Sequence, residues 1–205
     1  MSAPPKTVLT ATPAEEDSIR HAVRHADVSL LGPGRVIANA AHVPALVPFL
    51  SDPAVSGPIY DLPRPVNADT VAQWVAACAA ERQRGEGLLV LTMFDGEVGG
   101  YSKFTLWPDR ASGELGGAMA AHLQGQGAGM LGMMAGFDFL FDVLSVRLVG
   151  LTAALDNHRS ARNIDKAGFM RMGEREAVRA DGTIRRSIYW EMTRDNWHRL
   201  RRGGV

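Results

Sequence analysis

The six residues Gln124-Gly125-Gln126-Gly127-Ala128-Gly129 stand between a strand-like segment, Ser112 to Ala120, and an apolar segment that runs to Leu144. Three glycines in six residues predict a tight loop, and the apolar run predicts a buried helix after it. The first backbone N–H groups of a helix lack partners within it, and the helix dipole favours an anion there. We therefore expect the loop to bind a phosphate group; a packing turn without a ligand is the alternative.

The same loop also matches a dinucleotide-binding pattern, because Gly127 to Gly132 satisfies G-x-G-x-x-G. A Rossmann unit needs a parallel βαβ arrangement and an acidic residue about twenty positions later, at the end of the next strand. Here the preceding strand closes an antiparallel series, and Asp156 comes too far along the chain. The context therefore argues against a dinucleotide fold.

Hydrophobic periodicity and turn residues predict the elements on either side of this loop. The expected strands cover residues 35–39, 88–94, 97–106, 112–120, 146–153, 169–179 and 183–192, the last two joined by Asp181-Gly182, and the expected helices cover 42–50, 71–84, 130–144 and 157–167. Residues 1–30 are expected to form an N-terminal arm with one helix, and residues 31–205 a single α+β domain. The basic residues around Trp197 are expected to belong to a solvated tail.

Composition limits the class of protein. The chain has 205 residues, with 22 Lys and Arg against 22 Asp and Glu, so it carries no basic surplus for gripping nucleic acid. The single cysteine, Cys78, excludes a disulfide within the chain and the cysteine-rich metal sites. No segment has the roughly 18 uncharged apolar residues of a membrane span. We expect a cytoplasmic, bacterial-type protein with no nucleic-acid, membrane or metal partner.

A second motif follows the strand that ends at Ala153. Asn157, Ser160, Lys166 and Gly168-Phe169 form the pattern N-x-x-S-x-x-x-x-x-K-x-G-F, about thirty residues after the glycine loop. Together with Q-x-x-G-x-G, this pattern resembles the acyl-CoA-binding core of the GNAT N-acyltransferase superfamily. Further similarities indicate the RimJ/RimL-type branch: Gly34-Arg35-Val36, Phe49 to Pro53, Glu114-Leu115-Gly116, and Tyr189 with Trp197. The resemblance covers roughly Gly32 to Trp197.

The resemblance implies a mixed, mostly antiparallel central sheet, splayed at strands 4 and 5 and flanked by helices, with acetyl-CoA as co-substrate. The pyrophosphate is expected on the loop from Gln124 to Gly129, above all on the amides of residues 126–129. Asn157 and Ser160 are expected to face the pantetheine, and Ser160 to meet the leaving thiolate. Asn157 could equally cap its own helix, and Arg162 could reach the adenosine phosphates or be solvated.

The implied reaction is direct attack by a primary amine on the acetyl thioester. Glu114 is the first candidate for the general base; His122 and Glu176 are further candidates. Ile164 stands where many family members carry a tyrosine general acid, which leaves Ser160 or solvent for the thiolate. The expected acceptor is a small-molecule amine or a protein α-amine. A non-catalytic acyl-CoA-binding or interaction module remains the alternative, and the family makes a homodimer plausible.

Overall fold

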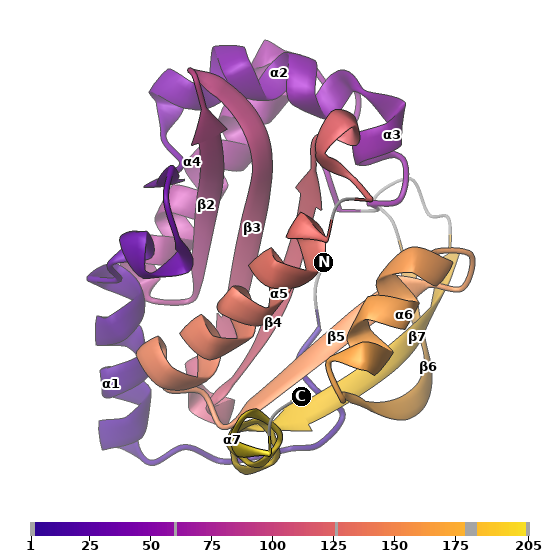
Figure 1. The fold of residues 1–205 in the computed structure, drawn as a ribbon. Helices are drawn as coiled ribbons and strands as arrows, with labels where there is room; N and C mark the ends of the chain where they lie inside the picture. The colour runs from indigo at the N-terminus through magenta and orange to yellow at the C-terminus, as the bar shows by residue number, and fades with distance from the viewer. Residues whose placement is uncertain (1–2, 60, 126, 179–183, 204–205) are drawn as a thin grey trace.

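The computed structural model describes residues 3–59, 61–125, 127–178 and 184–203, and a seven-stranded sheet forms their centre (Figure 1). The strands are β1 (Arg35–Ile37), β2 (Gly87–Phe94), β3 (Glu97–Trp107), β4 (Ser112–Met119), β5 (Leu148–Ala154), β6 (Met170–Val178) and β7 (Ile184–Thr193). Their order is β1-β2-β3-β4-β5-β7-β6, and only β4 and β5 pair in parallel. The expected mixed, mostly antiparallel sheet is confirmed.

Helices cover both faces of this sheet. They are α1 (Pro13–Arg24), α2 (Val43–Ser51), α3 (Pro53–Ser56), α4 (Ala68–Arg84), α5 (Ala128–Asp138), α6 (His158–Lys166) and α7 (Arg194–Arg202), and a π-helical turn, Phe139–Val143, continues α5. Local sequence explains the ends of α4: Asn67 and Thr70 form a capping box, and Gly85 adopts a left-handed φ of 73° after the last turn.

Two hydrophobic layers hold the helices to the sheet. On one face, which we call the α5 face, side chains such as Leu88 and Phe104 pack under Phe137. On the other, the α4 face, Leu91 and Tyr101 pack under the helices α2 and α4. Because β2 is buried on both faces, its sequence is a continuous apolar run without polar alternation.

The strands β4 and β5 separate soon after they meet. Ser112, Gly113 and Glu114 pair with Leu148, Val149 and Gly150. Beyond that point β4 continues beside β3 only, and β5 beside β7 only, so the two diverge as Figure 1 shows. The expected splay of the fourth and fifth strands is confirmed, and Glu114 lies at its vertex.

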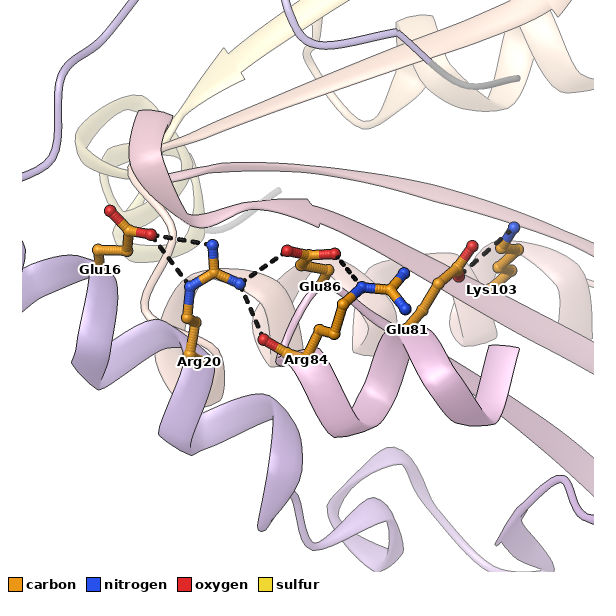
Figure 2. Close-up of polar contacts among 6 residues, drawn as sticks. All are labelled: Glu16, Arg20, Glu81, Arg84, Glu86 and Lys103. Carbon is orange, nitrogen blue, oxygen red and sulfur yellow. Dashed lines mark hydrogen bonds and ion pairs between the residues drawn. The ribbon is translucent and has the colours of Figure 1, made fainter. Parts of the chain in front are cut away.

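The N-terminal arm is fastened to the sheet and to α4. Ile19 and Val23, on one side of α1, are fully buried. Arg20 donates to the carboxylates of Glu16 and Glu86, each at 2.9 Å, and Glu86 also binds Arg84 (Figure 2). The helix expected in the arm is present, while the division of the chain at residue 30 stays a prediction.

The expected solvated tail is wrong, because residues 194–202 form α7. Trp197 is 1% exposed, packs edge-on against Phe137 and donates its Nε1–H to Asp138 at 2.9 Å. Trp197 and Leu200 attach this otherwise charged helix to the core, so the composition of the segment concealed its attachment. The expected turn Asp181-Gly182 lies outside the described residues. Among the helices that are described, none is long and apolar enough to cross a membrane.

Candidate active site

A cleft of about 720 Å³ opens where β4 and β5 part. Its walls come from β3, β4 and β5, from the glycine loop and α5, from α6, and from the segment around α3. Glu114 lines it at the vertex, and Thr152 lines it from β5. The cleft therefore joins the two sequence motifs, which are about thirty residues apart in the chain.

The N-terminus of α5 has no side-chain cap. Side chains of Thr12, Asn67, Asn157 and Thr193 cap α1, α4, α6 and α7, whereas no described side chain caps α5 or α2, and of these two only α5 begins at the cleft. Its N-cap residue is Gly127, with a φ of 80°, and a Cβ there would meet nothing within 4 Å. The uncapped N–H groups and the open space in front of them suit an anionic phosphate.

Gln124 links the end of β4 to α6 at the cleft. Its Nε2 donates to the carbonyl of Met119 at the end of β4 (2.9 Å), and its Oε1 accepts from Arg159 of α6 (2.5 Å). Arg159 lines the cleft, whereas Arg162 is exposed, outside the lining, and donates to the carbonyl of His158. The remaining expected loop ligand, Gln126, lies outside the described residues.

Helix α6 carries the second motif into the cleft. Asn157 and Ser160 both line it, and the Asn157 Oδ1 accepts the backbone N–H of Ser160 at 3.1 Å. The capping role foreseen for Asn157 is thus confirmed, and it leaves the Asn157 amide nitrogen for a ligand. Ile164 also lines the cleft but is 4% exposed and apolar.

The three candidate bases occupy different places. Only Glu114 lines the cleft, at its vertex. His122 is exposed on a short 3₁₀ turn, Ala121–Leu123, and Glu176 is exposed on β6 opposite Arg186; neither belongs to the lining. The geometry therefore favours Glu114. The described residues contain no group of three or more His, Cys, Asp or Glu side chains placed to hold a metal ion.

Sequence reasoning missed several polar residues of the cleft. Asp61, Lys103 and Arg185 all line the cleft. The Nζ of Lys103, on β3, lies 3.7 Å from the Oε2 of Glu81, on α4 (Figure 2). The register of β3 against β4, which pairs Thr105 with Glu114, could have placed Lys103 on the same face as Glu114. Asp61 lies within a proline-rich loop, residues 56–66, that carries no periodic signal.

Aromatic rings and a second cation complete the lining. Tyr101 meets Trp74 edge-on, with ring centroids 5.5 Å apart; burial, and secondarily the charge of Asp61, raises the pKa of the Tyr101 hydroxyl, which therefore stays protonated. Arg35 of β1 donates to the Thr92 hydroxyl on the α5 face, and burial lowers the pKa of its guanidinium. Tyr101 and Trp74 belonged to none of the motifs quoted from the sequence, whereas Arg35 stands in the Gly34-Arg35-Val36 motif, to which no role in the site was assigned.

The parallel strands β4 and β5 separate, and an uncapped helix N-terminus lies at the opening between them. This is the arrangement that the resemblance led us to expect for an acyltransferase that binds coenzyme A. The chain belongs to the GNAT acetyltransferase domain family: the model described as an acetyltransferase (GNAT) domain matches residues 35–170. This family transfers acetyl groups from acetyl-CoA, so the protein is an acetyl-CoA-dependent N-acetyltransferase. The membership expected from the two motifs is confirmed.

Solved structures show the same fold. A RimL-type α-N-protein acetyltransferase in complex with coenzyme A is 19% identical, with a TM-score of 0.69 over 81% of this chain and 97% of that one. RimJ from Mycobacterium smegmatis, also 19% identical, has a TM-score of 0.67 over 83% of this chain and 88% of its own. A ribosomal-protein alanine acetyltransferase from Vibrio fischeri is 13% identical, with a TM-score of 0.67 over 80% and 93%. No curated protein sequence matches the chain.

Proposed function

We propose that this N-acetyltransferase acetylates the α-amine of a protein or peptide, with Glu114 as the general base. The single observation that carries the proposal is the position of Glu114 at the vertex of the splay, inside the cleft that the uncapped α5 N-terminus also enters. A small-molecule primary amine is the alternative acceptor.

The chemistry of the amine favours a protein terminus. An α-amine has a pKa of about 7.7 to 8.0, against about 10.4 for a lysine-like amine, so a larger fraction is already neutral at pH 7. One carboxylate can remove the remaining proton, directly or through a water molecule. The RimL-type structural neighbour is also named for α-N-protein acetylation, which supports the same choice.

The cleft fits acetyl-CoA, which supplies the acetyl group as a thioester. The N–H groups of the loop ahead of α5 would hold the pyrophosphate, and the separated edges of β4 and β5 leave backbone groups to pair with the pantetheine arm. Ser160 would donate a hydrogen bond to the departing thiolate, and backbone N–H groups at the splay would polarise the carbonyl. Asn157, Gln124 and Arg159 would orient this half of the cleft.

A binding module without catalysis is a second candidate because of one observation. Ile164 contributes an apolar surface to the cleft, on the helix where many family members carry a tyrosine acid. Thiol release from acetyl-CoA, measured over peptide N-termini, diamines, amino acids and amino sugars, separates the two functions. We expect transfer to peptide α-amines; release no faster than hydrolysis with every amine, together with tight CoA binding, would favour the module.

We further propose a cytoplasmic, bacterial-type protein that can form a homodimer and has no nucleic-acid or membrane partner. The buried thiol of Cys78 supports a reducing compartment, and the balanced charge argues against nucleic-acid binding. Sedimentation equilibrium over a range of concentrations tests the dimer.

A further inference from the structure

Arg35, the first residue of β1, is a partly buried cation that lines the cleft without a carboxylate partner. Its guanidinium donates to the Thr92 hydroxyl of β2, whereas its Nε is buried and has no hydrogen-bond partner among the described residues. No ion pair joins Arg35 to a described carboxylate. Burial lowers the pKa of the guanidinium because no nearby anion opposes that effect.

Other partly buried arginines of the chain are neutralised by carboxylates. The Arg20 side chain, 23% exposed, binds Glu16 and Glu86, each at 2.9 Å (Figure 2). A cation that leaves water without a counter-charge is destabilising, so buried charges are normally paired, and an unpaired one in a cleft indicates a functional role. Arg35 therefore points to an anion that comes from outside the chain.

The uncapped end of α5 lies close to this cation. The Nη2 of Arg35 is 3.7 Å from the position that a Cβ would take at Gly132, in the second turn of the helix. A rise of about 1.5 Å per residue places Gly132 about 6 Å along the axis from Ala128, where α5 begins. Gly127, Ala128 and Gly129 line the same cleft as Arg35. The guanidinium thus lies about one turn behind the free N–H groups.

The phosphate site has little other positive charge that is shielded from water. The loop from Gln124 to Gly129 contains no basic residue, and the helix dipole supplies only about half an elementary charge. Arg159 and Lys166 of α6 also line the cleft, but both are exposed, so water and salt screen them. A partly buried charge is screened less and acts on an anion over several ångströms.

We propose that Arg35 is a positioning residue for the donor, which acts through its charge from beneath α5 and strengthens the binding of the coenzyme A phosphates at the N-terminus of that helix. This inference rests on the proposed function for the place of the pyrophosphate. It adds a residue from β1, about ninety positions before the glycine loop. The bound phosphates in turn supply the counter-charge that Arg35 lacks in the free protein.

The first test measures the Kd for CoA and for dephospho-CoA, which keeps the pyrophosphate, by isothermal titration calorimetry. Arg35→Met keeps a long side chain and removes the charge, so both Kd values should rise by about fivefold or more, as expected for one partly screened charge. Arg35→Lys keeps the charge, and its Kd values should stay near those of the parent protein. A loss in Arg35→Lys equal to that in Arg35→Met overturns the action through charge.

The matched control is Arg82→Met. Arg82 of α4 is also partly buried, and its Nε also has no partner among the described residues, but it lies outside the lining of the cleft. Its substitution removes the same charge and should leave both Kd values unchanged. Parent-like affinity in Arg35→Met, or an equal loss in Arg82→Met, overturns the inference.

Pantetheine, which carries no phosphate, separates an effect of charge from an effect on the shape of the cleft. Its affinity, measured by nuclear magnetic resonance titration, should be the same in Arg35→Met and in the parent protein. A loss for pantetheine as large as the loss for CoA would mean that the substitution distorts the cleft, and it would overturn the role of the charge.

A further test needs no ligand. Because a partly buried cation without a counter-charge opposes folding, ligand-free Arg35→Met should melt at the temperature of the parent protein or above it. The CoA-induced rise in melting temperature should be smaller in the variant than in the parent. A fall of more than about 3 °C in the ligand-free variant would show that Arg35 serves the fold, and it would overturn the inference.

The proposed function and this inference fail in different ways. If the parent protein binds no CoA, the donor site itself is wrong. If the parent protein binds CoA and Arg35→Met binds it equally well, only the role of Arg35 is wrong. None of these measurements requires an acceptor, so the result does not depend on Glu114 or on the choice of an α-amine.

Discussion

Substituting Gly129 by alanine should raise stability and weaken CoA binding at the same time. Gly129 lies in the first turn of α5, and a Cβ there would come no closer than 4.0 Å to its nearest neighbour, the Cε of Met119. The methyl group therefore meets no clash within the protein. Alanine is favoured over glycine in a helix by up to about 1 kcal/mol, which should raise the melting temperature by about 2 to 4 °C.

The same methyl group would stand where the backbone must approach the pyrophosphate. We expect at least a tenfold weaker Kd for CoA, equivalent to about 1.4 kcal/mol. At a CoA concentration of about 100 times the parent Kd, ligand stabilisation should fall from about 2.7 to about 1.4 kcal/mol. The CoA-induced shift should then drop from about 5 to 10 °C to about 3 to 5 °C.

Differential scanning fluorimetry with and without CoA measures both effects in one experiment. Gly132→Ala is the matched control, because it lies one turn farther from the uncapped amides and its Cβ would be 3.7 Å from Arg35. It should gain stability without losing CoA affinity. Parent-like affinity in Gly129→Ala, or an equal loss in both variants, would refute the assignment of the α5 N-terminus as the phosphate site.

Three further predictions concern catalysis, the core and pH. Glu114→Gln should lower kcat/KM for the acceptor about 10²- to 10⁴-fold with the CoA Kd unchanged, as steady-state kinetics and calorimetry can check; a drop below tenfold contradicts its role as base. Trp197→Ala should destabilise the protein by about 3 to 5 kcal/mol in urea unfolding, and a loss under 1 kcal/mol would mean that α7 is not anchored by its ring. Hydrogen bonds from Thr7 and Tyr189 outweigh burial and lower the pKa of Glu191, so its stabilisation is present above the unfolded pKa of about 4.3 and lost as pH falls through the folded pKa. In Glu191→Gln the free energy of unfolding should therefore fall less between about pH 5 and pH 3 than in the parent protein. An equal fall in both proteins would exclude this carboxylate as its source.

Local sequence signals predicted most of the fold. The seven strands and the helices α4, α5 and α6 were foreseen because alternation, caps and glycine turns act over a few residues. The attachment of α7 was not foreseen, because it depends on Trp197 and Leu200 packing against core residues distant in the chain, such as Phe137, sixty positions before Trp197. The short α3 was also missed, since a four-residue helix between prolines has no measurable period.

The candidate site likewise contains residues that local sequence indicated and residues that it did not. The residues predicted for the donor half lie in two contiguous motifs, at Gln124 to Gly129 and at Asn157 to Ser160, each at the N-terminus of a helix, so local sequence could indicate them. Asp61, Lys103 and Arg185 were not foreseen in the cleft, because they come from separate elements that only the tertiary structure brings together.

The sequence by itself predicted a phosphate-binding loop, because glycines ahead of a helix leave its first N–H groups free, and its two motifs resemble those of a family of acyltransferases, to which the chain belongs. Tertiary structure alone decided which candidate base faces the cleft. It placed Glu114 at the vertex and left His122 and Glu176 outside the lining. It also brought Pro5 to Gly150, 145 positions away, because strand pairing and buried hydrogen bonds act through space and leave no local trace in the sequence.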